Sequence, residues 1–275
     1  MKINYNFSLA KKRCKESRLR ILDLSQKVSA LHIGGSFSCI EILDIIYFGI
    51  MRKDTKKTFK DIFIMSKGHS SIAQYIILEK LGILKKKDIE NYCKPNGILG
   101  CHPDNTTNGI EASTGSLGHG IGLATGIAYA EKINNSGKKV FVILSDGELQ
   151  EGSTWESLMM AANLELDNLI FFLDHNGSQS FGKTKVTHPK FYPIDKKIKS
   201  FNLNCLEIKD GHNLKELLAK CKKIFKIKNK KPSFVICNTI KGKNVSFMEN
   251  KPIWHYRSPT TEEYKIAIKE VANEK

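Results

Sequence analysis

The stretch Val140-Phe-Val-Ile-Leu144 is followed directly by Ser145-Asp146-Gly147. A continuous apolar run of this kind is typical of a strand in a parallel sheet, because helices cover both faces of such a sheet. A second run of the same type, residues 169–173, leads into Asp174-His175-Asn176-Gly177. Polar groups at the carboxyl ends of buried parallel strands lie where ligands bind in these folds. The two stretches therefore predict a parallel sheet with a ligand site at its carboxyl edge.

The rest of the chain alternates helical patterns with short β-branched runs. This alternation predicts an α/β fold in three layers, with a mainly parallel sheet and helices on both faces. Further strands are expected at residues 62–65, 204–208 and 233–237. Helices are expected at residues 8–31, 39–51, from His69 onward, 155–166 and 214–227, with a turn at Gly34-Gly35. Since no linker, repeat or low-complexity tract divides the sequence, we expect one domain over residues 1–275.

The composition is that of an ordinary soluble globular protein. Of the 275 residues, 41% are apolar and 26% are charged. No apolar run approaches the roughly 18 residues that cross a bilayer, and residues 1–13 lack the apolar stretch of a secretory signal. The seven cysteines contain no CxxC pair, which argues against a zinc site or a disulfide framework. We therefore expect a cytoplasmic protein with no membrane partner.

Basic residues outnumber acidic ones, 44 to 28, which gives a formal net charge of +16. Such an excess occurs in proteins that bind nucleic acid or other anions. Here the lysines fall in short runs at expected element ends, not in one stripe interleaved with aromatic residues. This distribution favours a solvated lysine-rich surface and no nucleic-acid partner. A nucleic-acid-binding protein stays open as an alternative, and it predicts an affinity that falls steeply with salt.

Asp146 and Asn176 follow the two strongest strand patterns and carry oxygens that hard cations prefer. Mg²⁺ is usually held by one or two carboxylates together with phosphates of a ligand, and Ca²⁺ takes the same kind of oxygens. Gly147 would let the backbone approach such a ligand closely. The structural alternative is that both side chains only cap the segments that follow them, and each residue taken singly is better explained that way.

The segment Gly177-Ser-Gln-Ser-Phe-Gly182-Lys183-Thr184 fits the phosphate-loop pattern GxxxxGK[ST] and follows an expected strand. A phosphate loop continues into a helix, however, and Pro189 and Pro193 interrupt the residues that follow. No apolar strand that ends in aspartate lies downstream to hold Mg²⁺. We therefore reject a nucleotide hydrolase, which an assay of ATP hydrolysis would check.

Ser145-Asp146-Gly147, 27 further residues and then His175-Asn176 resemble the thiamine diphosphate signature, in which GDG is followed by NN at this spacing. Ser145 and His175 depart from the signature, whereas both expected metal ligands are kept. Between about residues 10 and 270 the chain also resembles transketolases, in blocks that follow the transketolase order. These blocks are Lys27-Val-Ser-Ala-Leu-His32-Ile-Gly-Gly, Ser66-Lys-Gly-His69, Gly100-Cys-His102-Pro, Thr114-Gly-Ser-Leu-Gly-His-Gly120, Asp210-Gly-His212 and Trp254-His255. The sequence is thus similar to the N-terminal, diphosphate-binding half of a transketolase.

The resemblance implies the thiamine diphosphate-binding fold (its PP module), with thiamine diphosphate and Mg²⁺, or Ca²⁺, as cofactors. It implies the Asp146 and Asn176 side chains and the Ser178 carbonyl as metal ligands. The residues that it places against the cofactor are His69, Gly115, Ser116, Leu117, Gly118, Asp146, Gly147, Glu148, Asn176 and His255. Small residues also recur at helical spacing, which predicts close packing of that helix. They are Gly118, Gly122, Gly126 and Ala130.

The reaction implied by the resemblance is transfer of a two-carbon ketol unit from a ketose, or a ketose phosphate, to an aldose. His32, His102 and His255 resemble the histidines of the family's substrate channel, which polarise carbonyls and move protons. Glu151 matches a glutamate that is buried at the family's subunit contact and completes the catalytic set. The histidines that keep a structural interpretation are His175, His188 and His212. His119 replaces the glutamine usual in its block, and its role stays open.

The resemblance covers only the diphosphate-binding half of a transketolase. The glutamate that activates the aminopyrimidine ring of the cofactor belongs to the other, pyrimidine-binding half. We therefore expect a partner chain that carries this half, most simply in a heterotetramer of two chains of each kind, and no activity without it. Tyr256 stands beside His255 where the family has glycine. Together with Ser145 and His175, it points to an unusual sugar substrate.

Two related enzymes stay open as alternatives. An α subunit of a 2-oxoacid dehydrogenase is also a thiamine diphosphate-binding half-chain, but the Ser66-Lys-Gly-His69 and Gly100-Cys-His102-Pro blocks favour the transketolases. A deoxyxylulose-phosphate synthase agrees less well, because that family usually has a single long chain.

Overall fold

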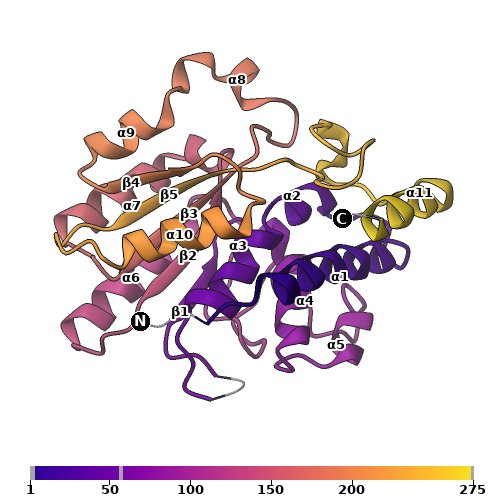
Figure 1. The fold of residues 1–275 in the computed structure, drawn as a ribbon, viewed down its shortest axis with the longest axis horizontal. Helices are drawn as coiled ribbons and strands as arrows, with labels where there is room; N and C mark the ends of the chain where they lie inside the picture. The colour runs from indigo at the N-terminus through magenta and orange to yellow at the C-terminus, as the bar shows by residue number, and fades with distance from the viewer. Residues whose placement is uncertain (1–3, 56–57, 274–275) are drawn as a thin grey trace.

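Five parallel strands form one sheet among residues 4–55 and 58–273, which the computed structural model describes (Figure 1). Their order across the sheet is β1-β2-β3-β5-β4. The strands are β1 (Ile62–Met65), β2 (Val140–Ser145), β3 (Leu169–His175), β4 (Asn204–Ile208) and β5 (Ser233–Asn238). All five lie where the sequence predicts them, and their parallel pairing confirms the α/β fold class. Residues 1–3 and 274–275 of the expected domain lie outside the described residues.

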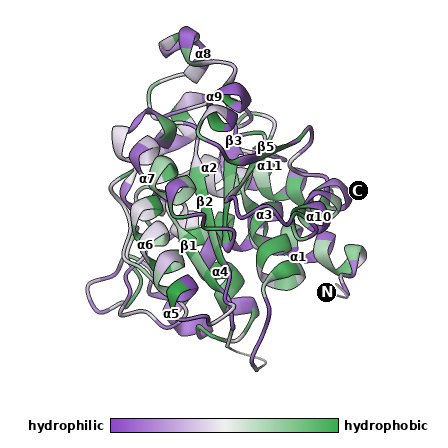
Figure 2. Ribbon diagram, turned by 90° about the vertical axis from the view of Figure 1, so that its left-hand side faces the viewer, coloured by the Kyte–Doolittle hydropathy of each residue, from purple (hydrophilic) through white to green (hydrophobic). Residues whose placement is uncertain are grey.

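Helices cover both faces of the sheet, which confirms the three-layer arrangement. One face carries α6 (His119–Ile133), α7 (Gly152–Asn163) and α9 (Ile194–Ser200). The core on the other face is built with α1 (Phe7–Ser25), α2 (Ile33–Ser38), α3 (Ile40–Asp44), α4 (Ser71–Lys80), α5 (Lys86–Glu90), α10 (Leu214–Ile224) and α11 (Thr261–Ala272). In Figure 2 the hydrophobic strands β1 and β2 lie between α6 and α7 on the left and α1, α3 and α10 on the right.

Strand β2 shows why its sequence is apolar without interruption. Phe141 and Ile143 pack into the core on the side of α1 and α10, whereas Val140, Val142 and Leu144 pack under α6 and α7. All five side chains are fully buried. Burying each one contributes roughly 1.5–3 kcal/mol relative to leaving it exposed. A polar residue would be unfavourable on either face, so polar and apolar residues cannot alternate along this strand.

Gly34 and Gly35 do not form the expected turn, because they lie inside α2. A Cβ atom on Gly34 would come within 2.7 Å of the Trp254 carbonyl oxygen, and one on Gly35 would meet the Ser70 hydroxyl at 3.2 Å. The glycine pair thus permits close approach of α2 to two other segments. The turn prediction was wrong because glycine occurs both in turns and where two segments approach closely, and the sequence alone does not distinguish the two cases.

Several helices end earlier than their sequence patterns. α1 begins after Asn6, whose side chain accepts a hydrogen bond from the Leu9 amide, and ends at Ser25 rather than at residue 31. Leu31 is still buried, so the apolar spacing runs on after the helix has ended. The helix expected at 39–51 is α3 followed by a π-helical segment, Ile45–Ile50. α10 ends at Ile224 rather than at residue 227.

The strip of small residues on α6 packs within the chain only at its start. A Cβ atom on Gly122 would lie 3.4 Å from the Ser157 hydroxyl of α7, whereas one on Gly126 would meet nothing within 4 Å. Ala130 is exposed. The buried residues of the helix are Gly120, Ile121, Ala124, Thr125 and Ala128. The expected close packing therefore does not extend along the strip inside this chain.

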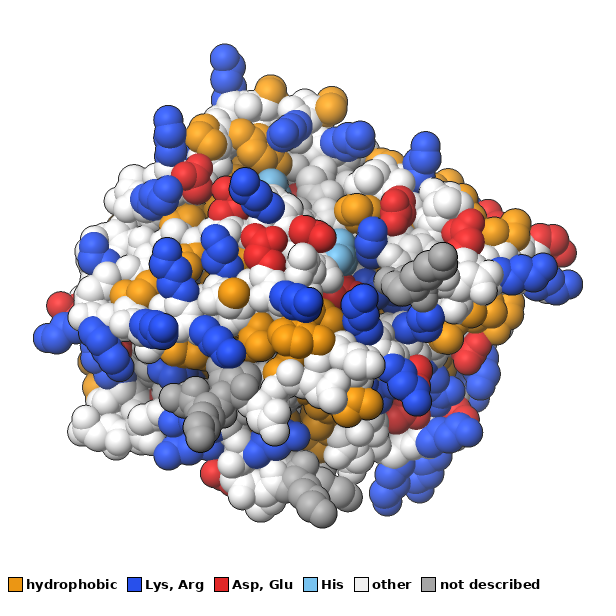
Figure 3. All heavy atoms as spheres, in the orientation of Figure 1, with side chains coloured by type: hydrophobic (Ala, Val, Ile, Leu, Met, Phe, Trp, Pro, Cys, Tyr) orange, Lys and Arg blue, Asp and Glu red, His pale blue; other side chains and the backbone are white. Residues whose placement is uncertain are grey.

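Basic side chains are spread over the face shown in Figure 3, where lysine and arginine alternate with acidic, apolar and other polar groups. This pattern agrees with a solvated lysine-rich surface on that face. Within residues 4–55 and 58–273, no helix has the length and hydropathy to span a bilayer.

Candidate active site

The ends of β2, β3 and β5 lie at one level of the sheet. Ser145 pairs with Asp174, and His175 pairs with Asn238. The polar residues that follow these strands therefore meet at the carboxyl edge, as parallel strands require. A cavity of about 350 Å³ opens there.

Most residues expected at the site line this cavity. They are His32, His69, His102, Gly115, Leu117, Gly147, Glu151, Asn176, Ser178 and His255. Asp146 lies next to Gly147 and is almost fully buried, with 2% of its surface exposed. Ser116 and Gly118 line an adjoining open groove of about 740 Å³, which shares His102 and Gly115 with the cavity.

Four histidines from separate segments meet in the cavity. His32 precedes α2, and its ring centroid lies 5.3 Å from those of His69 and His255 and 6.2 Å from that of His102. The half-exposed ring of Tyr256 packs against His32, with centroids 4.4 Å apart. The fold thus brings together the four histidines that the sequence places in separate motifs.

All four imidazoles are neutral near pH 7. Burial, the His102 ring and the Lys241 ammonium group lower the pKa of His32 to about 4. Burial, Lys241 and His32 lower the pKa of His255 to about 3. Burial also lowers the pKa values of His69 and His102. A neutral imidazole donates through one nitrogen and accepts through the other, so these groups can take up and deliver protons.

Two of these rings have partners that define which nitrogen carries the proton. Lys241 Nζ donates to His255 Nδ1 at 3.1 Å, and because an ammonium group cannot accept, the His255 proton lies on Nε2. Cys101 Sγ lies 3.2 Å from His102 Nδ1. Because a ring nitrogen is a better acceptor than a thiol sulfur, this contact favours Cys101 as the donor and the His102 proton on Nε2.

Asp146 is a buried carboxylate that is bonded by main-chain amides. The Gly147 and Gly177 amides donate to it at 3.1 and 2.6 Å. Burial, and then the nearby Asp174 carboxylate, raise the pKa of Asp146 to about 7. A cation bound at this carboxylate would favour the charged form instead.

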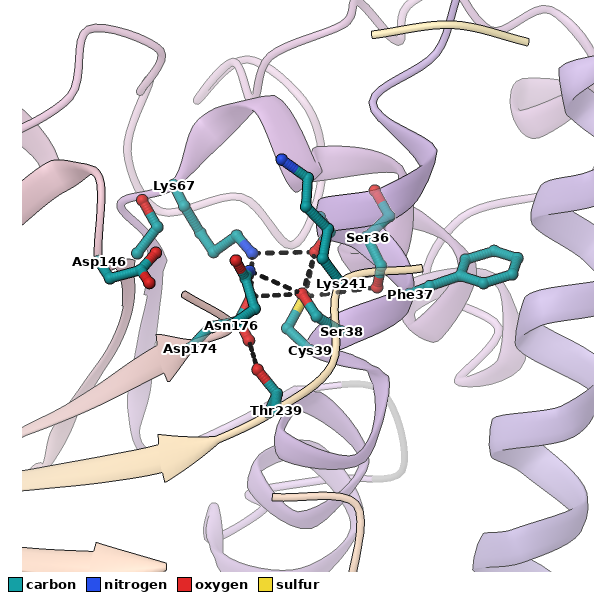
Figure 4. Close-up of polar contacts among 12 residues, drawn as sticks. Ser36, Phe37, Ser38, Cys39, Lys67, Asp146, Asp174, Asn176, Thr239 and Lys241 are labelled. Atoms are coloured by element: carbon teal, nitrogen blue, oxygen red, sulfur yellow. Dashed lines mark hydrogen bonds and ion pairs between the residues drawn. The ribbon is translucent and has the colours of Figure 1, made fainter. Parts of the chain in front are cut away.

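The side-chain amide of Asn176 is bonded on its nitrogen side by buried groups (Figure 4). Nδ2 donates to Asp174 Oδ2 and to Ser38 Oγ, both at 3.3 Å. Oδ1 accepts a hydrogen bond from the Ser178 amide at 3.1 Å. Asp174 forms a fully buried ion pair with Lys67.

The donor set at this edge suits a hard cation. It consists of the Asp146 carboxylate, the Asn176 amide oxygen and the Ser178 carbonyl. Asn176 and Ser178 flank Gly177 in the sequence, and the Gly177 amide donates a hydrogen bond to Asp146. In the part of the chain that the structure describes, no three His, Cys, Asp or Glu side chains are grouped as metal ligands. A cation here would complete its shell with oxygens of a bound phosphate, as Mg²⁺ commonly does. Gly147 keeps room beside Gln179, because a Cβ atom there would come within 3.3 Å of the Gln179 Cβ.

Glu148 supports the loop at the cavity mouth and does not line the cavity. Its carboxylate accepts hydrogen bonds from the Gly118 and Ser145 amides, at 3.0 and 3.3 Å, and from the Ser66 hydroxyl. Gly118 has a φ of +81°, which favours glycine, and a Cβ atom there would lie 2.8 Å from the Glu151 Cβ. Glu148 therefore positions the Gly118 backbone through its side chain, and its expected contact with a cofactor stays a prediction.

The three histidines with a structural interpretation do not line the cavity. His212 accepts from the Ile240 amide at Nε2 (2.9 Å), so its Nδ1 donates to Glu41 (2.8 Å). His175 Nδ1 donates to Asn238 Oδ1 at 2.7 Å. His188 is exposed. These contacts agree with the structural interpretation.

The segment that fits the phosphate-loop pattern is not followed by a long helix. α8 (Thr184–Thr187) is a single turn that ends before Pro189. The segment instead places Ser178 and Phe181 at the cavity. These findings agree with the rejection of a phosphate loop.

Two buried lysines at this edge are not among the residues that the sequence predicts for the site. Lys241 lines the cavity, and burial together with the Lys67 ammonium group lowers the pKa of Lys241 to about 8. Lys67 lies in one of the transketolase-like blocks, but the resemblance implies no role for it. Lys241 follows the carboxyl end of β5, so the rule that selects Asp146 and Asn176 could have found it.

Comparisons with known proteins agree with this geometry. Residues 9–269 match the family described as "Transketolase, thiamine diphosphate binding domain". The chain is 36% identical over 260 residues to an apulose-4-phosphate transketolase subunit of Phocaeicola vulgatus, covering 94% of this chain and 92% of that protein. It is 35% identical over 252 residues to the 6-deoxy-6-sulfo-D-fructose transketolase subunit SqwG of Clostridium sp., covering 90% of each.

A solved transketolase shows the same fold. The enzyme from Campylobacter jejuni matches with a TM-score of 0.88 at 24% identity, covering 98% of this chain and 43% of that chain. The family match over residues 9–269 and the two relatives above 30% identity extend this likeness to sequence. The chain therefore belongs to the transketolase family and corresponds to the N-terminal, thiamine diphosphate-binding domain of that family.

Proposed function

We propose that this chain forms a single domain and is the diphosphate-binding subunit of a two-chain transketolase. It would bind thiamine diphosphate through Mg²⁺ and transfer a two-carbon ketol unit from a ketose to an aldose. The observation that carries the proposal is the cavity of about 350 Å³, which gathers four neutral imidazoles beside Asn176 and the buried Asp146. Acid–base groups and the proposed cation site would meet there at the carboxyl edge of a parallel sheet.

The metal would bind at the bottom of the cavity. Asp146 would supply a carboxylate, Asn176 an amide oxygen and Ser178 a main-chain carbonyl, which suit Mg²⁺ and also Ca²⁺. The raised pKa of Asp146 supports this assignment, because the chain itself does not compensate that charge fully. His69 and His255 would donate hydrogen bonds to the phosphates; both line the cavity, and their ring centroids are 5.5 Å apart.

The proton transfers of the reaction fall to the histidines. When bound, thiamine diphosphate supplies the carbon nucleophile that ketol transfer needs. His32 and His102 would hold and move protons on the sugar hydroxyl and carbonyl oxygens, and His255 would share this task from the cofactor side. The negative charge of a bound diphosphate or sugar phosphate raises the pKa of a nearby imidazole, which brings His32 closer to neutral pH.

A partner chain would cover the face formed by α6 and α7. Large apolar side chains on this face are more than 40% exposed: Leu123, Tyr129, Ile133, Met159 and Met160. The open groove and the exposed Glu151 adjoin it. Obligate contacts typically bury more than about 2,000 Å² and are apolar. We propose that a chain with the pyrimidine-binding half and its ring-activating glutamate docks here, in a heterotetramer of two chains of each kind.

The substrate would be an anionic ketose. The two relatives described above are named for apulose-4-phosphate and for 6-deoxy-6-sulfo-D-fructose, and both are named as subunits. The basic net charge of +16 and the buried Lys241 suit substrates and cofactors that carry negative charge.

Co-purification with a separately encoded C-terminal transketolase half tests the proposal. The pair should carry out ketol transfer with thiamine diphosphate and Mg²⁺, and substitution of the partner's ring-activating glutamate should abolish it. Leu123→Lys on α6 should weaken assembly, whereas Ile266→Lys on α11, at similar exposure (47% and 49%), should not. Robust ketol transfer by this chain alone would contradict the two-chain assignment.

A further inference from the structure

We propose that Asp174, held by Lys67, is a positioning residue that fixes the amide of Asn176 with its oxygen available to the metal. The inference rests on the proposed function, because it concerns the cation that would hold thiamine diphosphate. It assigns a role to two fully buried residues that do not line the cavity.

The hydrogen bonds around Asn176 permit one orientation of its amide. Nδ2 donates to Asp174 Oδ2 and Ser38 Oγ, both at 3.3 Å, and Oδ1 accepts from the Ser178 amide at 3.1 Å. An amide turned by 180° would place its oxygen against the Asp174 carboxylate and its NH₂ group against the Ser178 N–H. Both contacts would be repulsive, because a carboxylate only accepts and an N–H only donates.

Asp174 can impose this orientation because it is itself immobilised from several elements (Figure 4). Lys67, which follows β1, forms an ion pair with it and also donates to the Gly35 carbonyl at 2.9 Å. Ser38 at the end of α2 donates to Asp174 Oδ2 at 2.6 Å. The Thr239 hydroxyl, which follows β5, donates to the other oxygen.

The pair of Lys67 and Asp174 carries no net charge, so its effect on a cation is chiefly orientation. A lone buried carboxylate in this place would attract the metal by itself and would also raise the cost of burying Asp146. With Lys67 as its counter-charge, Asp174 acts on the metal through Asn176. Groups that orient metal ligands in this way typically change metal affinity by about 10- to 100-fold when they are substituted.

The test uses the full chain with Lys67→Met and Asp174→Asn combined. This double variant keeps the net charge of the pair at zero, whereas Asp174→Asn alone leaves a buried ammonium group unpaired. Calorimetric titration with Mg²⁺ in the presence of thiamine diphosphate should show an affinity about 10- to 100-fold below that of the wild type. Thr125→Val on α6 is the matched control: it removes a buried hydroxyl that donates to the Ile121 carbonyl and not to Asp174 or Asn176, and its affinity should stay within about threefold.

A second background separates positioning from a general structural effect. Asn176→Ala removes the amide, so no orientation has to be imposed. In that background the Lys67→Met/Asp174→Asn change should alter affinity by less than about threefold. An equal loss of affinity in both backgrounds would overturn the proposal, and so would wild-type affinity in the double variant.

Nuclear magnetic resonance supplies a readout that does not need the metal. The Asn176 side-chain amide protons should exchange slowly in the wild type and at least about tenfold faster in the double variant, because their acceptors are buried. Fast exchange in the wild type would overturn the inference. If the wild type shows slow exchange but does not bind Mg²⁺ and thiamine diphosphate, the inference about orientation stands and the proposed function fails.

Discussion

Two buried acidic residues in this protein have pKa values that are shifted in opposite directions. Glu41 on α3 is bonded by two nitrogens of Arg18, at 2.7 and 2.8 Å, and by His212 at 2.8 Å. Burial acts to raise the pKa of Glu41, but Arg18 and His212 outweigh it and hold the pKa at about 2. Asp146 is equally inaccessible, yet its hydrogen bonds come from main-chain amides and its pKa is raised to about 7.

The difference supports the role that we propose for Asp146. Burial and polar contacts occur at both sites and do not distinguish them. At Glu41 the chain supplies its own counter-charge, which is the arrangement of a structural ion pair. At Asp146 the hydrogen bonds come only from main-chain amides, and we propose that a bound cation compensates the charge of this carboxylate, which lies beside the cavity with four histidines. We therefore expect substitutions at the two sites to separate stability from cofactor binding.

The largest effects are expected from substitution of the histidines that line the cavity beside Asp146. In the enzyme assembled with its partner chain, His32→Ala and His102→Ala should each lower kcat by roughly 10²–10⁴-fold, because general acid–base groups contribute that much. His69→Ala should mainly weaken the binding of thiamine diphosphate, measured by calorimetry. His188→Ala, which changes an exposed ring outside the cavity, is the control. If the three cavity variants behave alike, the division between proton-transfer and cofactor-binding histidines is wrong.

The next largest effect is expected from breaking the buried ion pair of Arg18 and Glu41. Arg18→Met leaves the buried Glu41 carboxylate without its guanidinium partner and should lower the free energy of unfolding by about 3–5 kcal/mol. Affinity for thiamine diphosphate with Mg²⁺ should not change. Arg20→Met breaks a partly exposed pair with Glu79 and should cost about 1 kcal/mol or less, measured by urea unfolding. A change in cofactor affinity with unchanged stability would reverse the assignment of this cluster.

A smaller effect concerns pH. The pKa of Glu41 in the folded chain, about 2, lies below its ordinary value of 4.5, so its stabilising contribution is fully present above pH 4.5. The contribution is lost as the pH falls through 2, and the difference in pKa corresponds to about 3 kcal/mol. Glu41→Gln removes this titration while the other carboxylates remain, so the difference between the two acid unfolding curves isolates it. Parallel curves between pH 4.5 and 2 would contradict the ion-pair interpretation.

The amino-acid pattern was sufficient for the sheet and for the meeting of polar residues at its carboxyl edge. Continuous apolar runs such as β2 have one physical explanation, burial on both faces, and polar residues after their ends must meet at one edge. Asp146 and Asn176 could therefore be placed at that edge from the strand pattern, whereas His32 was placed only by the resemblance to transketolases. Gly34 and Gly35 could not be interpreted correctly, because their reason is contact with Trp254 and Ser70, which are distant in sequence.

The roles of charged residues were harder to predict for the same reason. Lys67 follows β1 and Asp174 lies in β3, and only the folded structure shows that they form an ion pair next to Asn176. The resemblance to transketolases places both Asp146 and Glu148 at the cofactor. The structure shows in addition that the Glu148 carboxylate accepts a hydrogen bond from the Gly118 amide. Hydrogen bonds of this kind depend on side-chain direction, which spacing along the chain does not contain.

The central claim is that Asp146 keeps a charge for a metal ion, and one titration tests it most directly. The full chain, Asp146→Asn and Glu41→Gln are titrated with thiamine diphosphate at saturating Mg²⁺, and unfolding is measured for each. We predict that Asp146→Asn lowers cofactor affinity by more than about 100-fold without loss of stability. Glu41→Gln should lower stability and leave the affinity within about threefold. Equal cofactor affinity for the wild type and Asp146→Asn would contradict the account.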